Sequence, residues 1–257
     1  MNKSKVLNEI YDSLFKSFGK QYWWPGETDF EVVIGAILTQ NTNWTNVEKA
    51  IENLKAAKVF TPKKLYEIDI EKLAELIKPS GYFNVKAKRL KHFIEWLFSN
   101  YNGSLSKLFK QDFTTLREEL LSVNGIGKET ADSIILYAAE KPTFVVDAYT
   151  KRVLVRHGLI TEDYDYEAIK AVFEDNLPGN VPYYNEYHAL IVRVGKYYCK
   201  PKMQCEECPL ENVHRTRQTT SHPPGHQPDN VILAGAVRTG AGSTKNARKI
   251  KSGKKRK

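Results

Sequence analysis

The chain has 257 residues, 41% of them hydrophobic, which is enough to bury the core of one large domain or of two lobes. The chain has 39 Lys and Arg and 30 Asp and Glu. Residues 211 to 257 hold 11 of the basic and 2 of the acidic residues, which leaves 28 of each in residues 1 to 210. The net charge of +9 therefore lies in the C-terminal segment. Affinity of the remainder for a polyanion depends on how its charges are arranged.

No apolar stretch is long enough to span a membrane, and the N-terminus lacks a charged segment followed by an apolar leader. Three cysteines do not supply a disulfide framework. These features exclude the membrane and disulfide-rich secreted classes. We expect a cytoplasmic protein.

Apolar residues at helical spacing predict helices along most of the chain, starting with residues 4–18 and 29–40. Further helices are expected over residues 44–57, from Leu65, over 73–77 and 85–98, on both sides of Gly125, from Asp147, and over 166–173 and 183–197. Asn43, Thr61, Asp69, Asn84 and Asp147 stand at N-cap positions. The one β-like run, residues 143–146, is too short for a sheet, so the predicted fold class is all-α.

Between the first two helices stands the aromatic segment Tyr22-Trp23-Trp24-Pro25, in which the proline ends any preceding helix. It can serve as a core plug. Two adjacent tryptophans cannot point the same way from a helix or a strand, so at least one has another use.

The second predicted helix ends in Leu38-Thr39-Gln40-Asn41-Thr42. Short polar residues at such a place often only cap the helix.

The sequence Gly125-Ile126-Gly127 separates two amphipathic helices. The glycines allow a tight turn with Ile126 between the helices, and the second helix begins with unpaired amides that suit a phosphate. Because the turn follows a helix and not a strand, a nucleic-acid phosphate is a better ligand than a dinucleotide. An ordinary helical hairpin is the alternative.

Asp147 ends an apolar run and is expected to cap the next helix, which places its carboxylate at a defined, partly buried position. Most such aspartates do nothing more.

The pattern L-x-x-V-x-G-I-G-x-x-T-A followed by V-V-D resembles the helix-hairpin-helix DNA glycosylases of the endonuclease III superfamily, roughly from Lys3 to Leu210. The resemblance implies a two-lobed fold, with residues 25–147 in one lobe and residues 1–24 plus 148–210 in the other. After Leu210 the composition changes to Thr, Ser, Pro, Gly and His and ends in a basic run, which predicts a disordered basic tail over 211–257. The resemblance also implies double-stranded DNA with damaged bases as the partner, and a monomer. Asp147 would lie in the excision site, Gln40 would fill the gap left by the rotated nucleotide, and the hairpin would hold a phosphate through Gly125, Ile126, Gly127 and Lys128.

One position departs from the bifunctional members of that family, in which a lysine directly before Thr-Ala attacks the sugar. Here the residue is Glu129, and a carboxylate cannot form the imine. Lys128 is adjacent but is rotated by about 100° on a helix. We expect a monofunctional enzyme that removes the base and leaves the strand intact.

The combination of Trp-Trp-Pro, Leu-Thr-Gln-Asn-Thr and Gly-Lys-Glu is most similar to the 3-methyladenine glycosylases described in Helicobacter. A base that is already cationic on its sugar leaves as a neutral molecule and needs an aromatic cage more than an acid. Trp23, Trp24, Pro25 and Trp44 are the expected cage residues, with Glu129 beside them.

Basic residues follow the glycine-aromatic turn at Gly81-Tyr82, and Lys86 is the first candidate for a phosphate contact, with Lys88, Arg89 and Lys91. A solvated helix face explains such a run equally well. Lys196 is a weaker candidate for the wall of the base pocket.

Cys199, Cys205 and Cys208 form C-x5-C-x2-C, close to the C-x6-C-x2-C-x5-C iron–sulfur loop of endonuclease III. The fourth cysteine is absent, and His214 stands six residues after Cys208. A [4Fe-4S] cluster, a zinc ion and an empty loop are the three interpretations.

The predicted function is monofunctional excision of alkylated bases, 3-methyladenine foremost. Two alternatives remain. One is a bifunctional glycosylase and abasic-site lyase acting on oxidised pyrimidines. The other is a noncatalytic DNA-binding module.

Overall fold

The computed structural model describes residues 2–24, 26–202 and 204–213. Within those ranges the chain consists of helices and their connections, with no β-strand, so the all-α prediction is confirmed. Residues 143–146, whose pattern suggested a strand, form an irregular connection instead. The predicted basic tail lies outside the described residues from His214 onward.

The helices follow one another as α1 (Lys3–Phe18), α2 (Asp29–Leu38), α3 (Trp44–Ala56), α4 (Pro62–Glu67), α5 (Ile70–Leu76), the 3-10 helix η1 (Lys78–Ser80), α6 (Phe83–Tyr101), α7 (Leu105–Leu108), α8 (Phe113–Ser122), α9 (Lys128–Tyr137), α10 (Ala148–Arg156), α11 (Tyr166–Glu174) and α12 (Val181–Tyr197).

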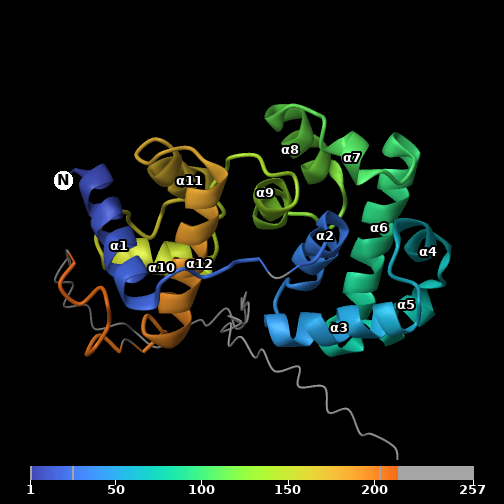
Figure 1. Cartoon of the computed structure of the whole chain (residues 1–257), viewed down its shortest axis with the longest axis horizontal. Coiled ribbons are helices and arrows are strands. Elements are labelled where there is room, and N and C mark those ends of the chain that lie inside the picture. The colour runs from blue at the N-terminus through green and yellow to red at the C-terminus, as the bar shows by residue number, and fades with distance from the viewer. Residues whose placement is uncertain (1, 25, 203, 214–257) are drawn as a thin grey trace, which may run out of the picture.

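Two groups of helices lie side by side, with α9 between them (Figure 1). One group contains α1, α10, α11 and α12, in which α12 contacts both α1 and α10. The other contains α2 to α8, and α9 contacts α2, α8 and α12. The first helix and the last three described helices thus share one group. The lobe boundaries at residues 25 and 147 stay a prediction.

Helix starts follow the predicted caps in most places. The side chains of Asn43 and Thr61 accept hydrogen bonds from backbone amides in the first turns of α3 and α4. Asp69 precedes α5 without such a bond. Asn84 lies inside α6, because the turn before that helix closes at Tyr82, which adopts a left-handed conformation with φ of 44°.

A buried ionic network fixes α9 against its neighbours. The carboxylate of Asp132 has no exposed surface and accepts hydrogen bonds from Arg117 of α8 at 2.7 Å and from the Tyr166 hydroxyl of α11 at 2.8 Å. Lys170 lies 3.3 Å away. Hydrogen bonding to Asp132 raises the pKa of Arg117, so its charge is retained. These three donors offset the desolvation of the Asp132 carboxylate. They also fix the position of α9, the helix that follows the hairpin.

Among the described helices, none is long and apolar enough to cross a membrane.

Candidate active site

The hairpin between α8 and α9 is built on one glycine that the backbone requires. Gly125 has φ of +94°, and a Cβ there would lie 2.3 Å from Cγ of Arg89 on α6. Gly127 has an ordinary φ of −94°, and a Cβ there would meet nothing within 4 Å. Ile126 is buried between the helices, as predicted. Gly125 therefore serves the fold, while the space at Gly127 is free for a ligand.

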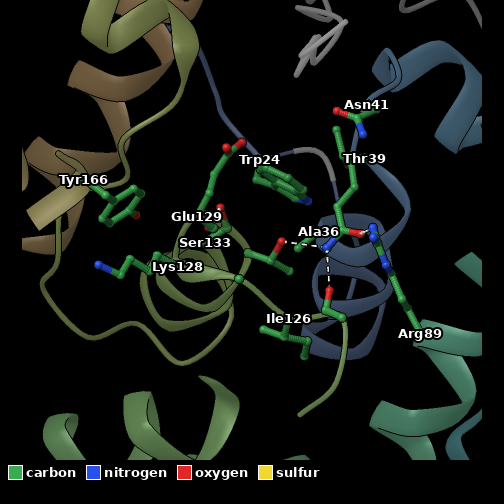
Figure 2. A pocket seen from close by; sticks show the side chains of 14 residues that line it. Trp24, Ala36, Thr39, Asn41, Arg89, Ile126, Lys128, Glu129, Ser133 and Tyr166 are labelled. Atoms are coloured by element: carbon green, nitrogen blue, oxygen red, sulfur yellow. Dashed lines mark hydrogen bonds between the residues drawn. The ribbon is translucent and has the colours of Figure 1, made fainter. Parts of the chain in front are cut away.

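A cavity of about 660 Å³ opens beside this hairpin (Figure 2). Its wall combines the hairpin, the start of α9 and the end of α2. The lining residues are Trp24, Ala36, Thr39, Gln40, Asn41, Arg89, Gly125, Ile126, Gly127, Lys128, Glu129, Thr130, Ser133 and Tyr166. No side chain caps the N-terminus of α9, so the partial positive charge of that helix end faces the cavity.

Gln40 joins α2 to the hairpin. Its amide donates to the Gly125 carbonyl at 3.0 Å and to the Thr130 hydroxyl at 2.9 Å, while its carbonyl accepts from Arg89 (dashed lines, Figure 2). These bonds hold Gln40 at the cavity wall. To fill a gap in a duplex, as the resemblance implies, it would have to exchange them for bonds to bases.

Lys86 has a different position from the one expected. Its ammonium is buried and donates to the carbonyls of Leu38, at 2.8 Å, and Ser80. Burial, followed by the charge of Arg89, lowers the pKa of Lys86 to about 8. The phosphate contact is not supported, because the amine joins the ends of α2 and η1 inside the protein.

Two other basic candidates lie at the surface of α6. Lys88 is exposed, and Lys91 is partly exposed and donates to the Tyr66 carbonyl at 2.8 Å. Lys196 lies at the end of α12 over the Tyr197 ring and is not among the residues that line the cavity.

Glu129 and Lys128 leave the start of α9 in different directions (Figure 2). The Lys128 amine pairs with Glu167 at 3.1 Å. Glu129 extends beside Trp24, and its carboxyl group makes no hydrogen bond or ion pair with the described residues. Burial, together with the negative charge of Asp147, raises the pKa of Glu129 to about 8. The surroundings therefore favour the neutral form of this carboxyl group.

Asp147 caps α10 as predicted, through one carboxylate oxygen. Oδ1 accepts from the Thr150 backbone amide at 2.7 Å and from the Thr150 hydroxyl at 2.8 Å. Oδ2 is buried without a hydrogen bond to the described residues, so capping occupies only one of the two carboxylate oxygens. Burial raises the pKa of Asp147, but His188 and the donors on Thr150 outweigh it, and the net shift is downward. Its side chain has no exposed surface and does not line the cavity.

His188 of α12 is a candidate site residue that the sequence did not reveal. Its Nε2 lies 3.6 Å from Oδ2 of Asp147, and its Nδ1 lies 2.5 Å from the Tyr137 hydroxyl. A single histidine on an apolar helix face, 41 residues after Asp147, gives no local signal. Only the packing of α9, α10 and α12 brings the three side chains together.

The three tryptophans of the expected cage have different environments. Trp24 lines the cavity and stacks on Tyr137, with ring centroids 4.9 Å apart. Trp44 is only 2% exposed and packs its edge near Gly35, where a Cβ would lie 3.1 Å from the ring. Trp23 contacts His188 edge-on. Pro25 lies outside the described residues. Of the three rings, Trp24 is the one that a base in the cavity would meet.

The cysteine loop is held by arginines. Arg156 donates to the Cys199 sulfur at 3.1 Å and to the Lys200 carbonyl, and Arg152 donates to the Cys199 carbonyl at 2.5 Å. No three metal-ligating side chains come together within the described ranges, and none of the three cysteines forms a disulfide. As arranged, they do not fit a cluster. His214, the expected fourth ligand, lies outside those ranges.

The helical fold, the hairpin and the aspartate at the start of α10 define the class of helix-hairpin-helix DNA glycosylases. The chain belongs to the HhH-GPD superfamily of base excision DNA repair proteins, whose family model matches residues 34–178. The family predicted from the sequence is thereby confirmed.

Individual relatives are similar over nearly their whole length. A Methanocaldococcus jannaschii protein, provisionally named a DNA repair glycosylase, is 51% identical over 82% of this chain and 96% of its own. The endonuclease III of Thermotoga maritima is 31% identical over 80% of this chain and 91% of its own. The structure of the H. pylori 3-methyladenine DNA glycosylase bound to 1,N6-ethenoadenine has 32% identity and a TM-score of 0.66, covering 76% of this chain and 98% of the other.

Proposed function

We propose that this protein is a monofunctional DNA glycosylase that hydrolyses the N-glycosidic bond of alkylated bases, 3-methyladenine foremost, and acts as a monomer. The observation that carries this proposal is the carboxyl group of Glu129 in the cavity wall, with the buried carboxylate of Asp147 behind it. Glu129 stands where a lyase has its lysine, and Asp147 is held ionised behind it. Such a pair supports hydrolysis but not imine formation.

Asp147 would act on the sugar. Its ionised carboxylate stabilises the positive charge that develops at C1′ and takes a proton from the attacking water. Because Asp147 has no exposed surface in the free protein, the incoming nucleotide must displace part of the wall above it. Nucleotide extrusion into the cavity is required in any case, since the bond lies inside the base stack.

The ring of Trp24 supports a preference for cationic bases. Stacking on a tryptophan adds cation–π attraction of roughly 1–2 kcal/mol when the cation is desolvated. The similarity to the H. pylori enzyme agrees with this preference. The uncapped end of α9 and the open side of Gly127 supply the phosphate site of the hairpin.

The bifunctional alternative is favoured by the name endonuclease III among the relatives. It requires an amine at the sugar. Lys128 is the one lysine among the lining residues, and its amine is paired with Glu167.

A [4Fe-4S] cluster has no part in the proposed chemistry, and iron and zinc analysis of the purified full chain tests whether the cysteine loop binds either metal.

Chromatography of the bases released from methylated DNA tests the proposed function. We expect free 3-methyladenine and an intact strand containing an abasic site. Borohydride treatment with abasic DNA should leave no covalent adduct, and an adduct would show the bifunctional mechanism. Asp147→Asn should still bind the lesion duplex but excise at least about 100-fold more slowly. Parental excision by that variant would show that Asp147 only caps α10.

A further inference from the structure

The carboxyl group of Glu129 in the cavity wall calls for an explanation beyond the absence of a lysine at this position. This carboxyl group neither caps α9, pairs with a cation nor accepts a hydrogen bond from the described residues, so its one contribution to the local fold is that of an acid in the first turn of a helix. It nevertheless lines the cavity beside Trp24, on the first turn of the helix that holds the hairpin. A cationic base needs no proton donor to leave, so 3-methyladenine alone gives no use for a neutral acid at this place.

We propose that the chain also excises neutral damaged bases, with the carboxylic acid of Glu129 delivering the proton that such a base needs in order to leave. This inference rests on the proposed hydrolytic function. It extends the substrate class of the same cavity from cationic bases to neutral ones.

Proton and electron transfers balance in this reaction. The bond between C1′ and the base nitrogen breaks, and its electron pair stays with the base, which takes the Glu129 proton at a ring nitrogen or carbonyl oxygen. Water adds to C1′ and gives its proton to Asp147. Exchange with solvent returns Asp147 to its ionised state and Glu129 to its protonated state. Two nearby carboxyl groups with opposite protonation states are the arrangement that this chemistry requires.

The surroundings of Glu129 keep the two roles apart. Asp147 at the start of α10 is hydrogen bonded by Thr150 and faces His188, which favours its ionised form. That negative charge, with burial, favours the neutral form of Glu129. The other ionisable groups around Glu129 are Tyr137 on its own helix, Tyr166 on α11, Lys128 with its partner Glu167, and Arg89, which is engaged with Gln40.

The pH dependence should differ between the two substrate classes. Glu129 loses its proton as pH rises through about 8, so excision of neutral bases should fall about tenfold per unit above that pH. Excision of 3-methyladenine should not fall in that range, because an ionised Glu129 attracts a cation.

Single-turnover excision from full-length protein on duplexes with one lesion each tests this inference. The probes are 3-methyladenine as the cationic base, and uracil, hypoxanthine and 1,N6-ethenoadenine as neutral bases, from pH 6.5 to 9.5. We expect at least one neutral base to be released. Glu129→Gln should lower the ratio of neutral-base to 3-methyladenine excision at least tenfold. Glu167→Gln makes the same substitution at a residue that does not line the cavity and should leave this ratio unchanged.

The outcomes separate the two proposals. Release of 3-methyladenine without any neutral base, or equal losses for both classes in Glu129→Gln, overturns the inference and keeps the proposed function. If no 3-methyladenine is released at all, the proposed function fails as well. If Glu129→Gln melts at a lower temperature than the parental protein, the test rests on the pH dependence of excision by the parental protein. The same pH dependence for cationic and neutral bases would contradict the inference.

Discussion

Oδ2 of Asp147 and Nε2 of His188 face each other at 3.6 Å in the interior, and neither atom has a hydrogen-bond partner in the part of the chain that the structure describes. The Tyr137 hydroxyl meets the other ring nitrogen at 2.5 Å. If that hydroxyl donates to Nδ1, the proton of the neutral imidazole stands on Nε2 and points toward Asp147. Helices α9 and α12 and the N-cap of α10 thus contribute one residue each to a chain that ends at the Asp147 carboxylate.

Replacing His188 by phenylalanine keeps the volume of the ring and removes its N–H. Because His188 lowers the pKa of Asp147, the acid-side fall in excision should move to higher pH in this variant. Tyr137→Phe should produce a smaller shift in the same direction. The measurement is the single-turnover rate of 3-methyladenine release between pH 4.5 and 7.5, and an unmoved acid limb at unchanged melting temperature would show that His188 is only a core residue.

The two glycines of the hairpin should respond differently to alanine. Gly125→Ala combines a left-handed backbone with a clash against Arg89, so we expect a loss of stability of about 1–3 kcal/mol. Gly127→Ala meets no protein atom, so its melting temperature should stay parental while binding to damaged and undamaged duplexes falls alike. A loss for Gly127→Ala confined to damaged DNA would contradict a phosphate contact that reads no bases.

Lys86 and Lys88 form a matched pair on α6, one buried and one exposed. Lys86→Met leaves the Leu38 and Ser80 carbonyls without their donor, and we expect a loss of about 1–3 kcal/mol in the free energy of unfolding. Lys88→Ala should change stability by less than about 0.5 kcal/mol and lower the salt slope of DNA binding by about 1.

The pH dependence of the Lys86 effect has a definite sign. The pKa of Lys86 is lowered in the folded protein to about 8, so the unfolded chain binds more protons between pH 8 and about 10.4. The stability of the parental protein relative to Lys86→Met should therefore increase over that range and decrease as the pH falls through 8. Denaturant unfolding at pH 7 and pH 9.5 measures this difference, and an equal or smaller difference at pH 9.5 would contradict the buried charge.

Local patterns predicted the helices, the hairpin and the cap at Asp147, because each depends on residues within a few positions of one another. The sequence could not show which side of a helix faces the interior at its polar positions. Lys86 thus looked like its neighbour Lys88, yet the approach of η1 to α2 encloses it. The surroundings of His188 and of Glu129 depend on contacts with other segments of the chain, such as those of His188 with Asp147 and Tyr137, which no local pattern records.

Trp24 and Trp44 provide the last prediction, which concerns what selects the base. The two rings contact each other edge to face, but Trp24 lines the cavity and Trp44 is buried in the core. Leucine at position 24 keeps apolar area and removes the ring quadrupole, so excision of 3-methyladenine should fall roughly 5- to 30-fold relative to any neutral base that is accepted. This is opposite in direction to the effect expected of Glu129→Gln.

Trp44→Leu is the control for packing. It removes a large side chain from the core and should lower stability by roughly 2–5 kcal/mol, with no change in the ratio of cationic to neutral excision. The two readouts are the melting temperature and the excision ratio on the same duplexes. If Trp24→Leu melts like the parental protein and still excises 3-methyladenine at the parental rate, Trp24 does not contact the base, and the preference for cations loses its physical basis.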